Sequence, residues 1–325
     1  MPSINELVEM GAEMVIRPPR YIYTDQELGP SDGFLDDTSF YRDDFTVHNA
    51  DNQILHGCIF FPGSRNDTPK PNTCIIYCHG NAGNLLDCLQ ICVEYLRRGL
   101  AVCGFDFSGC GLSDGKYITV GCREVQDVDA VHTYLQKSYS FDHIVLWGRS
   151  MGAAVTIQQA SLHPGRFVCC VADSPFARMM DVVDAMAEVM KNQFCGGFIV
   201  IPIGKSLIRS RIKKLTGMDI KHYSPIDVIS DTSTPLFIAH SPDDNLIPFK
   251  QAELLFNKYV SPDRELYHLS GDHNSERTRQ FFDTVFSFIE SHAQIGFQVR
   301  PKTEENPLLA KYASTLERPQ HSPLS

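Results

Sequence analysis

The sequence contains a G-x-S-x-G motif that could supply a catalytic nucleophile. Gly148-Arg149-Ser150-Met151-Gly152 follows the apolar run 144–147 and precedes a helical pattern over 153–162. A serine on a sharp strand-to-helix turn is exposed, and the flanking glycines leave room for that turn. The dipole of the following helix favours negative charge near its first residues. We therefore predict that Ser150 is a nucleophile, rather than part of a chance surface turn.

A serine hydroxyl needs a histidine to accept its proton, and the histidine needs a carboxylate to orient it. With this motif the acid and then the histidine are expected to follow the serine in the chain. His273 lies in a flexible turn between a predicted strand and the last predicted helix, and it is the predicted base. His268 lies inside that strand, where we expect a histidine of the core or of the sheet face.

Three aspartates could orient His273. Asp243 and Asp244 lie in the loop after a predicted strand, and the D-x-x-I-P spacing favours Asp244. Asp173 ends another predicted strand and could also reach the histidine, although it could instead cap a helix that opens at Ser174-Pro175. We expect Asp244 to be the acid and keep Asp173 and Asp243 as alternatives.

Negative charge that develops on a substrate oxygen needs hydrogen-bond donors. His79-Gly80-Asn81-Ala82-Gly83-Asn84 follows the apolar run 73–78, and its small residues would let the backbone approach a substrate. The backbone N–H groups of Asn81 and Met151 are the predicted oxyanion hole. The other interpretation of this segment is a simple glycine-rich turn.

The elements that must position these residues predict an α/β fold. Apolar runs alternate with helical patterns over 47–294, and the runs are continuous, which is typical of parallel strands buried on both faces. Helical stretches at 175–222 replace the expected single crossover, and we interpret them as a cap. Residues 1–46 are predicted to form an N-terminal helix and a lead-in segment, and residues 295–325 a disordered tail. The predicted strands are 53–61, 73–78, 100–105, 144–147, 167–172, 235–240 and 265–269, and the predicted helices of the domain are 85–96, 120–137, 153–162, 252–259 and 279–292.

Composition limits the partners and the compartment. The 325 residues include 29 Lys and Arg against 39 Asp and Glu, a net charge of −10, which argues against nucleic-acid binding. The 11 cysteines form no CxxC pair and no zinc spacing, so we expect free buried thiols in the cytoplasm, no metal and no cofactor. We expect no signal peptide, membrane-spanning segment or lipid anchor.

A basic stretch at 205–221 has apolar residues at helical spacing. We expect a solvated helix that packs this apolar stripe on the core. A weak contact with an anionic membrane or an acidic acyl carrier is the alternative. The basic residues are Lys205, Arg209, Arg211, Lys213, Lys214 and Lys221, against the single acid Asp219.

These motifs together resemble the α/β-hydrolase family. They are most similar to a group of largely uncharacterised plant and protist hydrolases with a serine aminopeptidase-like (hydrolase-4) domain. The resemblance covers about residues 5–292 and implies an eight-stranded fold and a triad of Ser150, Asp244 and His273, but it does not imply aminopeptidase activity. The core is more distantly similar to membrane-associated depalmitoylating hydrolases, whose N-terminal cysteine cluster does not occur here. The segments that carry the resemblance are Ile16–Arg20, His79–Gly83, Asp106–Ser113, Trp147–Gly152, Asp173–Phe176 and Gly271–Asn274.

The sequence therefore predicts a serine hydrolase that cleaves an ester, thioester or amide in a small-molecule or acyl substrate. The alternative is a non-catalytic binding or scaffold module of the same fold, which would not need the complete set of serine, acid, histidine and oxyanion donors. The acyl group, the leaving group and the oligomeric state are not predicted.

Overall fold

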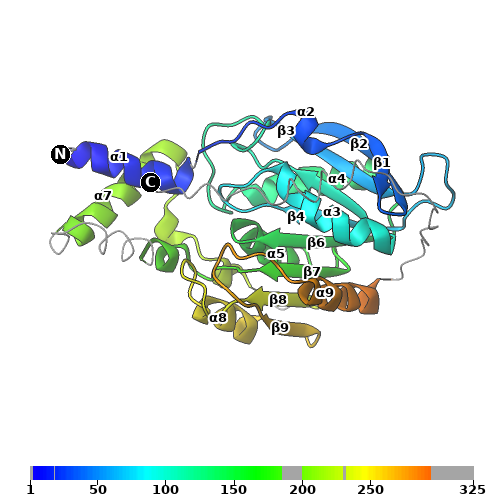
Figure 1. Ribbon diagram of the computed structural model, residues 1–325. Coiled ribbons are helices and arrows are strands. Elements are labelled where there is room, and N and C mark those ends of the chain that lie inside the picture. The colour runs from blue at the N-terminus through cyan, green and yellow to red at the C-terminus, as the bar shows by residue number, and fades with distance from the viewer. Residues whose placement is uncertain (1–2, 18, 185–199, 230–231, 294–325) are drawn as a thin grey trace.

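The computed structural model describes residues 3–17, 19–184, 200–229 and 232–293. Within them, helices cover both faces of a nine-stranded sheet (Figure 1). The strands are β1 (Asp32–Leu35), β2 (Thr38–His48), β3 (Ile54–Pro62), β4 (Thr73–Cys78), β5 (Ala101–Phe105), β6 (His143–Arg149), β7 (Cys169–Asp173), β8 (Leu236–His240) and β9 (Arg264–His268). The α-helices are α1 (Ile4–Ile16), α2 (Asp25–Leu28), α3 (Leu89–Tyr95), α4 (Glu124–Ser138), α5 (Met151–Leu162), α7 (Val200–Thr216), α8 (Lys250–Lys258) and α9 (Arg279–His292). Short 3-10 helices are η1 (Leu85–Cys88), η2 (Leu96–Arg98), η3 (Ile220–His222) and η4 (Pro225–Val228).

The strand order is β1-β2-β3-β5-β4-β6-β7-β8-β9. Neighbours from β5 to β9 pair in parallel, whereas β1, β2 and β3 pair antiparallel and join the sheet along β5. The predicted α/β-hydrolase fold with a mostly parallel sheet is confirmed. The carboxyl ends of the parallel strands meet at one edge of the sheet, where ligands bind in folds of this kind.

Each central strand sends alternate side chains into two separate cores. On β4, the side chains of Cys74, Ile76 and Cys78 belong to the core that α4, α5 and α8 cover. Those of Ile75 and Tyr77 belong to the core that α3 and α9 cover. All six residues of β4 are buried. Burial on both faces explains why the sequence of this strand is a continuous apolar run.

The lead-in segment contains strands that the sequence analysis did not identify. β1 and most of β2 lie within residues 1–46, and the sheet has nine strands where the resemblance implied eight. β2 buries Phe40 and Phe45, and its buried Arg42 donates to the carboxylate of Asp44 through Nε at 2.7 Å. Burial does not alternate along β2, since Phe40, Tyr41 and Arg42 are buried in succession, so the two-residue period that marks a strand is interrupted in the sequence.

The predicted cap lies between β7 and β8. The structure describes its residues 175–184 and 200–222, whereas residues 185–199 and the predicted tail at 295–325 lie outside the described residues. Helix α7 of this insertion packs against α1, and the two helices project from one end of the sheet (Figure 1).

Candidate active site

Ser150 lies between the end of β6 and the start of α5 in a strained backbone conformation. Its φ is 53° and its ψ is −113°, a combination that residues other than glycine rarely adopt. Its backbone N–H donates to the carbonyl oxygen of Asp173 at 2.8 Å, and its own carbonyl accepts from Ala154 at 3.1 Å. These bonds from two elements hold the turn in place, and strained residues of this kind cluster at functional sites.

The two glycines of the motif are required by close backbone contacts. A Cβ atom on Gly152 would overlap the carbonyl of Cys78 at the end of β4, and one on Gly148 would overlap the backbone of Gly152. The first turn of α5 therefore packs directly on the neighbouring strand. This packing presents the Ser150 hydroxyl at the carboxyl edge of the sheet.

The structure brings Ser150, His273 and Asp244 together in one hydrogen-bonded chain. His273 Nε2 lies 3.1 Å from Ser150 Oγ, and His273 Nδ1 lies 2.7 Å from Asp244 Oδ2. Asp244 is in the loop after β8, and His273 is in the loop after β9. The three side chains thus come from the carboxyl ends of three parallel strands.

Asp244 is held as a buried carboxylate. Its Oδ1 accepts the backbone N–H groups of Leu246 at 2.9 Å and Ile247 at 2.7 Å, and its side chain is inaccessible to solvent. Burial by itself raises the pKa of Asp244, but hydrogen bonds from His240, His273 and the Ile247 N–H outweigh burial and hold the pKa well below its ordinary value. Asp244 therefore presents a negative charge to His273 near neutral pH.

The predicted oxyanion residues lie beside Ser150. Asn81 and Met151 line the same cavity as the serine, and a Cβ atom on Gly80 would lie 3.7 Å from the Ser150 Cβ. Met151 is the first residue of α5, where backbone N–H groups have no partner inside the helix. The side-chain Oδ1 of Asn81 is buried without a hydrogen-bond partner among the described residues, so it could accept a bond from a ligand.

His79 holds the glycine-rich loop in place. Its Nε2 accepts the backbone N–H of Phe107 at 3.1 Å, so its Nδ1 carries the proton and donates to Gly80 O at 2.7 Å. Burial lowers the pKa of His79 to about 4 despite the bond to Gly80. This histidine is therefore neutral near pH 7 and fixes the approach of Gly80 to Ser150.

Residues 69–200 match the family model described as serine aminopeptidase, S33 (Hydrolase_4). The protein YqkD of Bacillus subtilis is 27% identical over 227 residues, which cover 68% of this chain and 72% of that protein. Alpha/beta hydrolase domain-containing protein 17C of Mus musculus is 25% identical over 252 residues, which cover 75% of this chain and 66% of that protein. The solved structure of the Pyrococcus furiosus esterase Pf2001 aligns with a TM-score of 0.64 and 23% identity, over 85% of this chain and 99% of that chain.

The chain belongs to the α/β-hydrolase superfamily. The esterase structure shares the fold of this chain. The family match and the α/β-hydrolase relatives support a hydrolase. In this α/β hydrolase, no helix of the described residues is both long and apolar enough to cross a bilayer. The ten cysteines among the described residues are free thiols, and nine of them are buried.

The alternatives to Asp244 and His273 lie in other environments. Asp243 is exposed to solvent. His268 is exposed on β9, and its ring packs edge-to-face with that of Phe249, with 5.0 Å between the ring centroids. Asp173 is buried and forms a two-point ion pair with Arg277, in which both N–H···O distances are 2.8 Å. The expectation that Asp173 caps a helix is wrong, because the segment after it becomes helical only at residue 179.

Two arginines that the sequence analysis missed hold the backbone of His273. Arg149 donates to the carbonyl of His273 at 3.1 Å, and Arg277 donates to the same carbonyl at 3.4 Å and to that of Ser275 at 2.6 Å. Because Arg277 also pairs with Asp173, this arginine ties the histidine loop to the strand beside the serine turn. No local pattern marks Arg277, since its partner lies about a hundred residues earlier in the chain.

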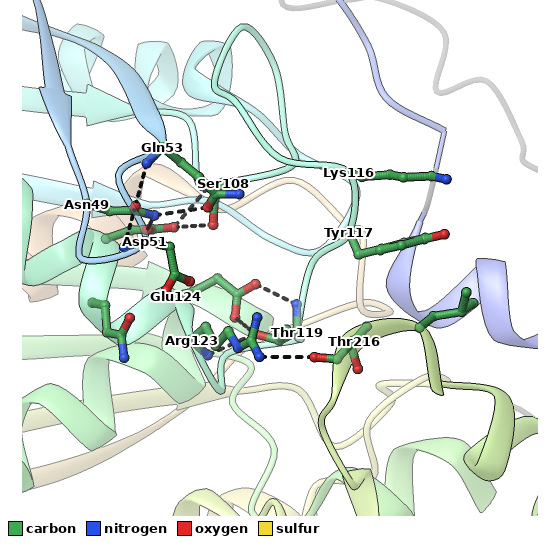
Figure 2. Close-up of a pocket in the computed structure, with 13 residues that line it drawn as sticks. Asn49, Asp51, Gln53, Ser108, Lys116, Tyr117, Thr119, Arg123, Glu124 and Thr216 are labelled. Carbon is green, nitrogen blue, oxygen red and sulfur yellow. Dashed lines mark hydrogen bonds between the residues drawn. The ribbon is translucent and has the colours of Figure 1, made fainter. Parts of the chain in front are cut away.

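A second, polar pocket of about 230 Å³ lies at the start of α4 (Figure 2). Its buried Glu124 accepts from the Thr119 N–H at 2.6 Å, the Thr119 hydroxyl at 2.7 Å and the Gly121 N–H at 2.8 Å. Asp127 accepts from Ser108 and Asn49, and burial raises its pKa to about 7. These carboxylates fasten the loop between β5 and α4, which also contributes a wall of the cavity at the serine.

Helix α7, which contains most of the basic stretch, packs an apolar residue into the core and pairs two of its arginines with carboxylates, as expected for a solvated helix. Ile212 is buried, and Arg209 and Arg211 form ion pairs with Asp219 and Glu9, with shortest N···O distances of 2.6 and 2.5 Å. Asp219 and Glu9 together supply two negative charges against the six basic side chains of the stretch.

Proposed function

We propose that this α/β hydrolase is a serine hydrolase that cleaves a carboxylic ester, thioester or amide through an acyl-enzyme on Ser150. The observation that carries the proposal is the unbroken hydrogen-bond chain from Ser150 Oγ through His273 to Asp244. A nucleophile, a base and an orienting acid in hydrogen-bond reach of one another form the arrangement that acyl transfer requires.

In the proposed acylation step, Ser150 Oγ attacks the carbonyl carbon of the substrate while His273 Nε2 takes the hydroxyl proton. The carbonyl π electrons move onto the oxygen, and the backbone N–H groups of Asn81 and Met151 stabilise that oxyanion. As the tetrahedral intermediate collapses, the bond to the leaving group breaks and His273 returns the proton to the leaving atom. Asp244 keeps the His273 Nδ1 proton in place and stabilises the imidazolium.

Deacylation repeats the sequence with water. His273 Nε2 removes a proton from water, the hydroxide oxygen adds to the acyl carbon, and Ser150 leaves with the proton that His273 holds. The products are a carboxylic acid and the free serine. Every proton in these steps is carried by His273, so the proposal calls for no metal or cofactor. We place the protein in the cytoplasm, since its buried free thiols fit a reducing compartment.

A fluorophosphonate probe tests the nucleophile directly. The purified protein should be labelled at Ser150, and Ser150→Ala should abolish labelling and ester turnover. The variant should stay folded, because the turn is held by backbone hydrogen bonds to Asp173 and Ala154 that the substitution keeps. Ser206→Ala is the matched control, since Ser206 is exposed on α7 away from the site.

Full labelling of the Ser150→Ala variant would refute the proposal. A wild-type protein that takes no label and turns over no ester would favour a non-catalytic binding module of the same fold.

A further inference from the structure

The cavity beside Ser150 is small and apolar. Its volume is about 50 Å³, and apart from Ser150 and Asn81 its lining side chains are hydrophobic. An apolar cavity of about 150 Å³ holds a benzene ring, so one-third of that volume has room for roughly two to four carbons. The lining hydrophobic residues are Val15, Val120, Met151, Phe176, Met179, Val182, Leu246 and Ile247.

We propose that this cavity binds the acyl group of the substrate, that it selects short acyl chains, and that Val15 of the N-terminal helix limits their length. The proposal rests on the proposed function, because it assigns the acyl side of the bond that Ser150 would attack. It adds a substrate class and a specificity-determining residue that lies outside the hydrolase motifs.

The N-terminal helix is fastened to the active-site end of the sheet by its last residue and the segment that follows it. The Ile118 N–H donates to the carbonyl of Ile16 at 2.9 Å. Arg20 donates through Nε to Gly111 O at 2.8 Å, through Nη1 to Gly115 O at 3.1 Å and through Nη2 to Ser113 O. One guanidinium thus binds three carbonyls of the loop between β5 and α4, and it ties the segment after α1 to that loop.

A second attachment holds α1 against the cap (Figure 1). Glu9 on α1 accepts from Arg211 on α7 through both carboxylate oxygens, at 2.5 and 2.9 Å. Gly11 faces Ile208, which fills the place that a side chain there would occupy. Attached to both the loop and the cap, α1 forms a fixed wall that presents Val15 to the cavity.

The two faces of α1 allow a matched comparison. Val15 is 6% exposed and lines the cavity, whereas Met14, the preceding residue, is 45% exposed. A truncation at either position removes apolar atoms from the same helix turn. Only the change at Val15 alters the space available to an acyl chain.

The test is a series of p-nitrophenyl esters with acyl chains of two, four, six and eight carbons. The wild type should prefer two or four carbons, with kcat/KM at least about tenfold lower for eight. Val15→Ala should raise kcat/KM for six carbons relative to two by about tenfold, and Val15→Phe should lower the value for four relative to two. Met14→Ala should keep the wild-type profile.

A wild type that prefers eight carbons, or a chain-length profile that Val15→Ala leaves unchanged, would overturn the proposal. If Val15→Ala does not fold, Met179→Ala enlarges the cavity from the cap side and should give the same shift, and an unchanged profile there overturns the proposal equally. Fluorophosphonate labelling of each variant separates the two levels of inference. Loss of the chain-length effect with labelling intact refutes the acyl pocket alone, whereas no labelling of the wild type refutes the serine hydrolase itself.

Discussion

The buried ion pair between Asp173 and Arg277 should be required for stability. Both side chains are at most 5% exposed, and the pair has two N–H···O bonds of 2.8 Å. Replacing Arg277 with methionine leaves a buried carboxylate without its partner, which costs about 3–5 kcal/mol of unfolding free energy. The double variant Asp173→Asn/Arg277→Met removes both charges, so it should be less destabilised than the sum of the two single variants.

The pH dependence of this effect has a definite sign. Burial alone raises the pKa of Asp173, but Arg277, with help from Arg149 and Ser174, outweighs burial and lowers the pKa below its ordinary value. A carboxyl whose folded pKa is lowered contributes stability above its unfolded pKa of about 4, and this contribution is lost as the pH falls through the folded pKa. In Arg277→Met the unpaired carboxyl can take up a proton instead, so the difference from the wild type should shrink between pH 7 and pH 4.

The chain supplies its own probe for this measurement. Trp147 is the single tryptophan of the sequence, and it is buried on β6 three residues before Ser150. Urea unfolding followed by its fluorescence should give the free energies of the four proteins at both pH values. A loss below about 1 kcal/mol in Arg277→Met, or strictly additive single effects, would refute the reasoning.

Three further changes test other parts of the structure. Asp244→Asn should lower kcat for ester hydrolysis by about 10⁴-fold, because an amide favours the wrong histidine tautomer. Asp243→Asn is the control and should have little effect in the same assay. The reverse order would contradict the assignment of Asp244 as the acid. Gly152→Ala should lower the unfolding free energy by about 1–3 kcal/mol in urea titration, because its Cβ would overlap the neighbouring strand, and a neutral result would contradict the close packing of the serine turn. The wild type should not co-sediment with anionic liposomes. Co-sedimentation that added salt weakens and that Lys213→Glu/Lys214→Glu abolishes would show instead that α7 binds a membrane.

The sequence alone predicted the parts of this protein that depend on local order. The strands β4, β5, β7 and β8 are fully buried, and β6 is buried except at its two end residues. They appear as apolar runs because each is covered on both faces. The turn at Ser150 is encoded by a strand, a helix and two glycines within about ten residues. His273 was predicted as the base from its place between the last strand and the last helix, and the structure brings it within hydrogen-bond distance of Ser150. In each case the signal lies in neighbouring residues.

Tertiary structure decided what depends on contacts between distant segments. Asp244 and Asp173 both follow parallel strands, and only the fold shows that Asp244 contacts His273 while Asp173 is neutralised by Arg277. Strand β2 was missed because its buried Arg42 pairs with Asp44, and a hydrophobic pattern does not show that a charged residue is buried. Val15 lines the same cavity as Ser150, at the end of a helix that Glu9 and Arg20 fasten to two other elements. These contacts join segments far apart in the chain, so no sequence pattern predicts them.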